Sequence, residues 1–355
     1  MRSVFASLFL VLLLQQQLRA QPENPVILFR SEDAGNGGCY RIPALITAAD
    51  GSLIAAADQR NGSCGDLRWN DDINIVVRRS FDGGHNWSEM ATVVDYPAGK
   101  SASDPSMILD VSTGTIFLFF NFMDHEKGEK NYQLRYICSH DHGSSWSDAV
   151  DITDALSPPE WQRHFMFISS GHGIQTRDGM LLHTLVNLEK GLYLFGSKDH
   201  GKSWQLMTNA LLPGDESKVV ELHNGNWLVN SRVNGTGKRH THRTYNEGAD
   251  WISQADDALP DPGCNAGLIV YPMEDGQEAL LFSNAADSSE RQNLTLSISF
   301  DGGQSWHTRQ SIWQGAAAYS DMAILPDGSL GLVFEKGDYH EIAYVKIRKE
   351  ILFGQ

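Results

Sequence analysis

The stretch Ser80-Phe81-Asp82-Gly83-Gly84-His85-Asn86-Trp87 contains a pattern that the chain repeats: Ser, any residue, Asp, any residue, Gly, two residues, Trp. Further full copies run over 139–146, 197–204 and 299–306, and a weaker copy over 244–251 replaces the Asp by Asn. The five copies start 59, 58, 47 and 55 residues apart. Repetition with such a period indicates a repeat architecture.

Each copy follows an apolar or β-branched run, such as 73–77, which predicts that the pattern lies on a hairpin turn between strands. Further runs at 116–120, 192–195, 294–298 and 330–334 are typical of strands, and Asp-Gly or Asn-Gly pairs separate such runs. A repeat of about 55 residues matches a four-stranded propeller blade, and the chain has room for about six. We therefore expect an all-β fold, with residues 21–355 forming a single six-bladed β-propeller.

The first twenty residues have the layout of a cleavable signal peptide. Arg2 precedes an apolar run over 4–14, and small and polar residues follow up to Ala20. An apolar run of this length is too short to span a bilayer, so an uncleaved anchor is the weaker alternative. We expect residues 1–20 to be removed, and the mature protein to be secreted or periplasmic without stable insertion into a membrane.

The net charge of the chain limits the classes of partner that it is expected to bind. A formal net charge of −16 disfavours nucleic acid and anionic membrane surfaces as partners. No Gly-rich phosphate loop or dinucleotide fingerprint occurs, so no organic cofactor is expected. His240 and His242 form the best metal-like pair, but no third ligand is evident nearby, and we expect no metal.

The segment Tyr40-Arg41-Ile42-Pro43, followed by the repeats, resembles the exo-α-sialidases (neuraminidases) of the bacterial and animal type, whose repeats are called Asp boxes. The resemblance extends from about Tyr40 to Glu335. It implies a six-bladed propeller with the active site at one end of its axis and the Asp boxes at the opposite rim. It also implies sialylated glycans as substrates. Asp boxes occur in non-enzymatic receptors as well, so the argument for function rests on the site.

The substrate's chemistry explains what such a site needs. Sialic acid carries a carboxylate on its anomeric carbon, which repels an Asp or Glu nucleophile, whereas a neutral phenol is not repelled. The resemblance implies Tyr319 as nucleophile and Glu216 as its base, 16 residues before Arg232 as in the family. Glu221 is the rival base, but it follows two valines and is typical of a strand residue.

The acid/base candidate is Asp66, in a Gly-rich loop. The family motif usually continues with Pro-Asn-Asp after this residue, whereas this chain continues with Leu67-Arg68-Trp69-Asn70-Asp71. Asp71 and Asp72 follow closely, and a solvated loop carboxylate is the alternative interpretation for each of the three acids. The resemblance favours Asp66 as the group that protonates the leaving oxygen and then deprotonates water.

Three arginines are candidates for a clamp on the substrate carboxylate. Arg41, Arg232 and Arg291 each lie in a segment similar to an arginine-bearing segment of the family. A guanidinium matches a carboxylate bidentately and stays charged at any relevant pH. A surface ion pair is the ordinary reading of an isolated arginine, but three arginines in three matching segments indicate convergence.

The resemblance supplies supporting residues as well. Glu335 is similar to the carboxylate that orients the first arginine, and Arg60 and Asp104 are similar to polar contacts with the sugar. Cys39 and Cys64 flank the stretch that carries Arg41 and Asp66, and a disulfide between them is expected in an exported chain. Aromatic residues that either line the pocket or belong to ordinary packing are Trp69, Phe122, Trp161 and Phe165.

The sequence thus predicts an exo-α-sialidase that removes terminal sialic acids with retention of configuration. A trans-sialidase, or an intramolecular trans-sialidase, would use the same residues with a sugar hydroxyl in place of water. A catalytically silent lectin or receptor with Asp boxes is a third alternative, although binding alone would not need the Tyr, its base and a separate acid.

Overall fold

The computed structural model describes residues 23–35, 37–128, 131–161, 164–246 and 248–354, and the signal peptide expected at 1–20 lies outside them. β-strands are the main regular secondary structure of the described chain and helices are few, which confirms the all-β prediction. All the runs predicted as strands from the sequence are strands: 73–77, 116–120, 192–195, 294–298 and 330–334.

The strands form sheets of antiparallel neighbours that follow one another along the chain. The first sheet contains β2 (Cys39–Thr47), β3 (Leu53–Arg60), β4 (Ile73–Ser80) and β5 (Ala91–Val94). The second contains β6 (Lys100–Asp110), β7 (Thr115–Asp124), β8 (Tyr132–Ser139) and β9 (Val150–Asp151), with β11 (Gly171–His172) added in parallel to β6. The third contains β10 (Met166–Ile168), β12 (Ile174–Gln175), β13 (Leu181–Asn187), β14 (Gly191–Ser197) and β15 (Gln205–Leu206).

The remaining strands follow the same plan. The fourth sheet contains β16 (Ser217–Glu221), β17 (Trp227–Ser231), β18 (Lys238–Thr244) and β19 (Trp251–Pro260). A continuous seven-stranded sheet contains β20 (Gly267–Pro272), β21 (Glu278–Ala285), β22 (Gln292–Ser299), β23 (Thr308–Ile324), β24 (Leu330–Lys336), β25 (Glu341–Ile347) and β1 (Val26–Arg30). It is continuous because residues up to Ala316 of β23 pair with β22, and residues from Ala317 onward pair with β24.

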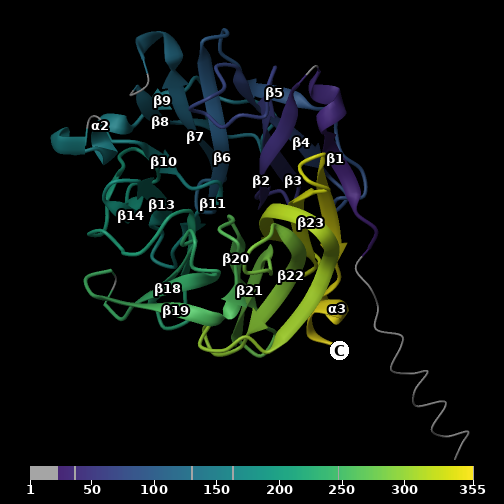
Figure 1. Cartoon of the computed structure of the whole chain (residues 1–355). Coiled ribbons are helices and arrows are strands. Elements are labelled where there is room, and N and C mark those ends of the chain that lie inside the picture. Colours follow the sequence, from purple (N-terminus) through teal and green to yellow (C-terminus); the bar gives the residue numbers. More distant parts are fainter. Residues whose placement is uncertain (1–22, 36, 129–130, 162–163, 247, 355) are drawn as a thin grey trace, which may run out of the picture.

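The inner strands of the sheets meet around a common centre. β2 contacts β6, β6 contacts β12, β12 contacts β16, β16 contacts β20, β20 contacts β23, and β23 returns to β2. In Figure 1 the labels β2, β6, β11 and β20 accordingly lie near the middle of the molecule, and β5, β9 and β19 lie nearer its edge. Buried apolar clusters fill the spaces between neighbouring sheets, as where Ile54 and Ile75 pack with Leu118 and Phe120.

Every Asp box lies on a hairpin turn, as the sequence predicts. It begins at the last residue of the third strand in a run of consecutive antiparallel strands, namely β4, β8, β14 (in the run β12 to β15), β18 and β22. In the first box the hydroxyl of Ser80 donates to Asp82 over 2.9 Å, and the backbone N–H of Gly84 donates to that hydroxyl over 2.8 Å. The copies that start at Ser139, Ser197 and Ser299 have the same pair of bonds. The boxes therefore stabilise hairpin turns at one end of the sheets.

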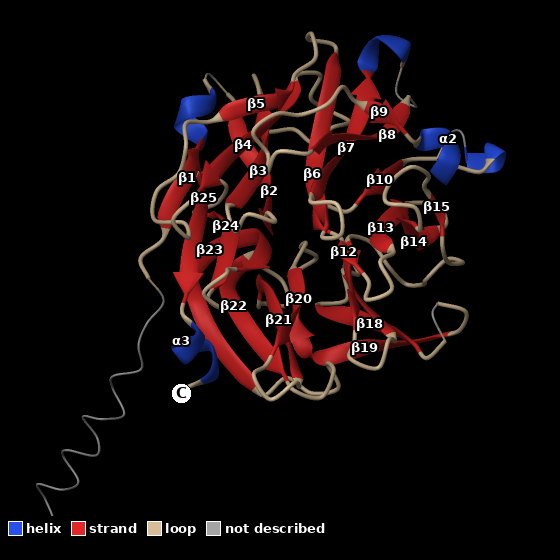
Figure 2. Ribbon diagram, turned by 180° about the vertical axis from the view of Figure 1, so that it is seen from behind, coloured by secondary structure: helices blue, strands red, loops and turns tan. Residues whose placement is uncertain are grey.

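The helical segments are short and lie at the edge of the molecule, where Figure 2 shows them in blue. The α-helices are α2 (Thr153–Leu156) and α3 (Lys349–Phe353), and the 3-10 turns are η1 (Ser31–Ala34), η2 (His125–Lys127) and η3 (Pro159–Trp161). Within the described ranges, none of these helices is long and apolar enough to cross a membrane.

Candidate active site

The predicted site residues gather at the end of the molecule opposite the Asp boxes. Glu216 immediately precedes β16, Arg41 lies near the start of β2, and both are first strands of their sheets. The boxes follow the third strands, and in an antiparallel sheet the third strand ends where the first strand ends. The starts of the first strands therefore lie at the other end, as the family resemblance implies.

Bulges in the inner strands set the direction of several of these side chains. The pairing of β2 with β3 skips between Arg41 and Ala44, and that of β6 with β7 skips between Ser103 and Ser106. Within these bulges Ile42 has φ 59° and Asp104 has φ 60°, a left-handed conformation that non-glycine residues seldom adopt. The pairing of β23 with β24 shifts in the same way beside Tyr319. Such bulges re-aim side chains and are common next to active sites.

Tyr319 and Glu216 form the centre of the site. The Tyr319 hydroxyl donates to Oε2 of Glu216 over 2.6 Å, and both side chains are buried. Burial and the negative charge of Glu216 hold the pKa of the Tyr319 hydroxyl well above its usual value, and they outweigh Arg232 and Arg291. The two arginines lower this pKa, but by less than burial and Glu216 raise it. The phenol is neutral, and its proton points at a carboxylate.

The three clamp arginines surround this tyrosine. Nη1 of Arg232 donates to the Tyr319 hydroxyl over 3.0 Å and also forms an ion pair with Glu216. The guanidinium carbons of Arg41 and Arg291 lie 5.8 Å and 5.4 Å from the centre of the Tyr319 ring. Three fixed positive charges therefore converge at one point in a chain of strongly negative net charge.

Glu335 joins the first arginine to the tyrosine. Its Oε1 accepts from Nε of Arg41 over 2.5 Å and from the backbone N–H of Ile42 over 2.9 Å. Its Oε2 accepts from the backbone N–H of Tyr319 over 3.2 Å. Because Glu335 is 1% exposed, this carboxylate holds both the clamp and the tyrosine backbone inside the protein.

Tyr339 is a site residue that the sequence did not indicate. Its ring lies 3.9 Å from the guanidinium carbon of Arg41, and its hydroxyl accepts from Nη1 of Arg291 over 3.1 Å. It thereby links two of the clamp arginines. It lies in the turn between β24 and β25 with φ 68°, and no motif in the sequence marks this position.

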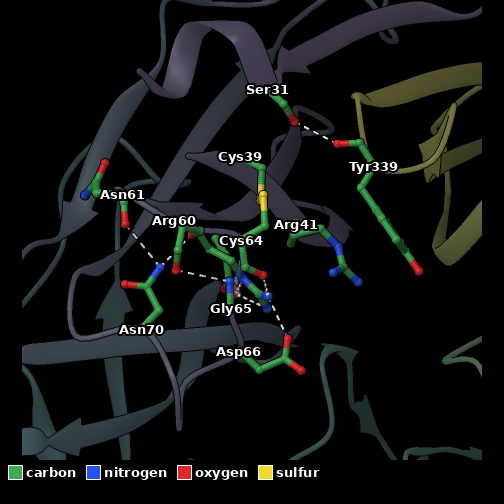
Figure 3. Close-up of a disulfide and its surroundings, with 12 residues drawn as sticks. Ser31, Cys39, Arg41, Arg60, Asn61, Cys64, Gly65, Asp66, Asn70 and Tyr339 are labelled. Atoms are coloured by element: carbon green, nitrogen blue, oxygen red, sulfur yellow. Dashed lines mark hydrogen bonds and ion pairs between the residues drawn. A yellow bond between two sulfur atoms is a disulfide. The ribbon is translucent and has the colours of Figure 1, made fainter. Parts of the chain in front are cut away.

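Figure 3 shows the loop that carries Asp66 beside the first arginine. A disulfide joins Cys39 to Cys64, with 5.5 Å between the Cα atoms, as expected. Nη1 of Arg60 donates to Asp66 over 2.6 Å, while the rest of the Arg60 guanidinium is held by the buried Asp58. The Asp66 side chain itself is 64% exposed, so it stands at the mouth of the site.

Asp104 lies between Asp58 and the central pair. Burial, followed by the charge of Asp58, raises the pKa of Asp104 to about 8 even though Arg60 opposes this shift. The Nδ2 of Asn121 donates to the Asp104 carboxyl over 3.0 Å. A carboxyl with such a pKa is largely protonated at neutral pH and can donate a hydrogen bond to a polar ligand group.

A cavity of about 230 Å³ is lined by some of the candidates, namely Asp66, Asp104, Glu216, Arg232 and Tyr319. Trp69 and Phe165 line it as well. The other aromatic candidates do not, since Phe122 and Trp161 are buried in apolar clusters between sheets. The rival base Glu221 lies at the far end of β16, where it accepts from the backbone N–H of Arg177 over 2.7 Å.

Comparisons with known proteins agree with this geometry. The model of the family described as "BNR repeat-like domain" matches residues 51–332. The chain belongs to this BNR repeat-like family. Among its curated relatives is a sialidase from Micromonospora viridifaciens, 33% identical over 84% of this chain and 50% of the relative. The chain thus spans half the length of that relative.

Solved structures with the same fold extend the likeness of this BNR repeat-like chain. "Hadza microbial sialidase Hz136" superimposes with a TM-score of 0.83 at 27% identity, covering 92% of this chain and 68% of that one. A leech intramolecular trans-sialidase, solved with 2,7-anhydro-Neu5Ac, superimposes with a TM-score of 0.80 over 95% of this chain and 71% of that one. At 21% identity the second likeness shows the fold alone.

Proposed function

We propose that this protein is an exo-α-sialidase that releases terminal α-linked sialic acids from glycoproteins, glycolipids and oligosaccharides. The observation that carries the proposal is the buried Tyr319–Glu216 hydrogen bond of 2.6 Å amid three converging arginines. A binding protein would need the arginines to hold a carboxylate, but not a buried phenol directed at a base.

The reaction divides into two displacements. In the first, Oη of Tyr319 bonds to the anomeric carbon as the bond to the leaving oxygen breaks. The phenolic proton passes to Glu216, and Asp66 as carboxylic acid protonates the leaving oxygen. A bound sugar would cover Asp66, and removal of a carboxyl group from water favours its protonated form.

In the second displacement, water attacks the same carbon and gives its proton to the Asp66 carboxylate, while Glu216 returns a proton to Tyr319. Two inversions leave the configuration retained. During both steps Arg41, Arg232 and Arg291 hold the substrate carboxylate, and Glu335 holds Arg41. Asp104 lines the cavity, where it can contact polar groups of the sugar ring, whereas Arg60 is buried behind Asp66 and Asp58 and holds their carboxylates.

The scaffold proposed for this site is a single six-bladed propeller over residues 21–355. The closed sequence of contacts among inner strands supports it, since β23 returns to β2. The long strand β23 would supply the outer strand of one blade and the inner strand of the next, which explains the seven-stranded sheet. We also propose that residues 1–20 are cleaved and that the protein is secreted or periplasmic, which mass spectrometry of the exported protein can test.

Transfer to a sugar hydroxyl is the second candidate function. Trp69 is 73% exposed beside Asp66, and an aromatic ring at the mouth can exclude water or stack on an acceptor sugar. An intramolecular reaction would give a 2,7-anhydro product of the kind bound to the leech enzyme.

One experiment separates these functions. The purified protein is incubated with α2,3- and α2,6-sialyllactose, with and without added lactose, and the products are separated by chromatography with mass detection. We expect free sialic acid. A 2,7-anhydro product, or sialic acid on the added acceptor, would assign the transferase function instead. If the protein binds sialyllactose without forming a product, and Tyr319→Phe binds it equally well, the lectin is the function that remains.

A further inference from the structure

A second layer of buried charges lies directly beneath the catalytic pair. Lys218 lies on β16, two residues after Glu216, which immediately precedes this strand, and Asp321 lies on β23, two residues after Tyr319. The charges of Asp321 and Glu216 both act on Lys218. Lys218 is 1% exposed and Asp321 is fully buried, so the two strands that carry the reacting groups also carry a buried cation and a buried anion at matching positions.

The partners of these two charges come from separate strands around the centre. Nζ of Lys218 donates to the carbonyl of Ser170 over 2.6 Å and to Oδ1 of Asn265, just before β20, over 2.9 Å. Oδ2 of Asp321 accepts from the backbone N–H of Leu45 on β2 over 2.9 Å. Its Oδ1 lies 2.6 Å from Nδ1 of His172 on β11.

Gly171 shows how closely the two charges approach each other. A Cβ added to this glycine would lie 3.1 Å from Nζ of Lys218 and 3.2 Å from Cγ of Asp321. Both charges therefore contact the same backbone position, which has φ 102° and suits glycine. A buried ammonium or carboxylate is stable only when another charge and several hydrogen bonds compensate for lost water, and here each group meets that need across strands.

We propose that Lys218 and Asp321 are positioning residues that set β16 against β23, so that the Glu216 carboxylate and the Tyr319 hydroxyl meet. This inference rests on the proposed sialidase function for its kinetic part. β16 and β23 belong to different sheets and share no ladder of backbone hydrogen bonds, so side-chain contacts contribute to their relative height at this point. A misplacement of about 1 Å between reacting groups can lower a rate by about 100-fold.

The burial of Lys218 beside these charges also predicts an upper pH limit for kcat. Burial lowers the pKa of Lys218 to about 8, and the charges of Asp321 and Glu216 only partly oppose this. Above about pH 8 the ammonium is lost, Asp321 loses its compensating charge, and kcat falls. The titratable or charged groups that face Lys218 from the elements around it are Glu216, Asp321, His172, His183 and Arg239.

The kinetic test compares Lys218→Met and Lys218→Gln with the wild type. We expect Lys218→Met to lower kcat by roughly 10- to 100-fold with KM within about twofold, because the arginine clamp is untouched. Gln keeps a hydrogen-bond donor without the charge, so Lys218→Gln should recover part of kcat and lack the decline above pH 8. If the decline persists in Lys218→Gln, it belongs to Asp104 and the pH part of the proposal is overturned.

A matched pair of carboxylates controls for simple loss of stability. Asp321→Asn should lower kcat, whereas Asp110→Asn should not. Asp110 is a matched control because it is equally buried and lies 2.8 Å from Nδ1 of His200, at the end of the molecule that carries the Asp boxes. If Lys218→Met does not fold, the variant Lys218→Met with Asp321→Asn removes both charges and avoids an uncompensated carboxylate. Folded variants with kcat within twofold of the wild type would overturn the proposal.

A structural readout keeps this inference separate from the proposed function. The NMR signal of the Tyr319 ring, assigned by its loss in Tyr319→Phe, should shift in Lys218→Met and stay unchanged in Asp110→Asn. An inactive wild-type protein would refute the sialidase function but leave this readout valid. An unshifted Tyr319 signal in folded Lys218→Met would refute the positioning role whatever the activity.

Discussion

The end of the molecule that carries the Asp boxes (the box end) and the end that carries the candidate site (the site end) both contain aspartates, but in opposite protonation states. At the box end, the backbone and side-chain N–H groups of Asn86 donate to Asp82 and lower its pKa to about 2. At the site end, burial and the neighbouring Asp58 raise the pKa of Asp104 to about 8. The Asp82 carboxylate is charged and has hydrogen-bond donors around it. The Asp104 carboxyl instead keeps a proton, which the stability of the fold alone does not require. The repeats therefore stabilise the scaffold, whereas the unrepeated end, with its strained backbone, is suited to chemistry.

The tyrosines repeat this contrast. At the box end Tyr271 is buried and donates its hydroxyl to the carbonyl of Gly328 over 2.7 Å. At the site end Tyr319 donates to the carboxylate of Glu216. A phenol bonded to a carbonyl oxygen can only stabilise the fold, whereas a phenol bonded to a carboxylate has a base available to accept its proton.

The largest expected effect comes from removing these two hydroxyls in turn. Tyr319→Phe should lower kcat on sialyllactose by about 1,000-fold or more, because the attacking oxygen is gone. Tyr271→Phe should keep kcat and lower only the melting temperature. Calorimetry with a sialic acid analogue should show that Tyr319→Phe still binds, since the arginines remain. Near-normal turnover by Tyr319→Phe would remove this residue as the nucleophile.

The next effect depends on the leaving group. Asp66→Ala should lower kcat/KM on sialyllactose by roughly 100-fold, but much less on aryl sialosides, whose phenolate departs with little protonation. Asp71→Ala changes an exposed acid of the same loop and should leave both substrates almost unaffected. Equal losses on the two substrate types would contradict the role of Asp66 as acid.

A smaller effect should appear in stability against pH at the site end. A carboxyl whose pKa is raised on folding adds stability below its unfolded pKa of about 3.9, and this stability is lost as pH rises through about 8. The melting temperature of the wild type should therefore fall between pH 4 and 8 by on the order of 5 °C more than that of Asp104→Asn. Parallel melting curves across this range would show that Asp104 has no raised pKa.

The smallest effect is expected for Asp82 at the box end, where stability should depend on pH in the opposite direction. Because the pKa of Asp82 is lowered on folding, its stabilisation is present above about pH 4 and is lost as pH falls through about 2. Asp82→Ala should lower the melting temperature at pH 7 by about 2–4 °C with kcat unchanged. The gap between variant and wild type should close near pH 2, and a gap that persists there would assign the loss to packing.

The sequence predicted the features that local motifs carry. The boxes, the strand runs and the residues Arg41, Glu216, Arg232, Arg291 and Tyr319 could all be found, because each stands in a short recognisable segment. The geometry then brought these residues together as expected. Their roles in catalysis stay predictions until they are measured.

Features that depend on contacts between distant segments could not be found in this way. Tyr339 lies in an ordinary turn and reaches Arg41 and Arg291 only through the arrangement of the sheets. The charges of Lys218 and Asp321 are hidden in strand patterns where apolar residues are expected. The raised pKa of Tyr319 follows from burial, which no motif reports.

The pairing of β1 with β25 has a consequence for the order of folding. Val26 lies opposite Tyr344, and Arg30 forms an ion pair with Glu341, so the first described strand pairs with a strand that is far away in the sequence. The seven-stranded sheet therefore stays incomplete until β25 has been synthesised. A circular permutant in which β1 directly follows β25 would turn this distant pairing into a local hairpin, and its refolding should be faster for that reason.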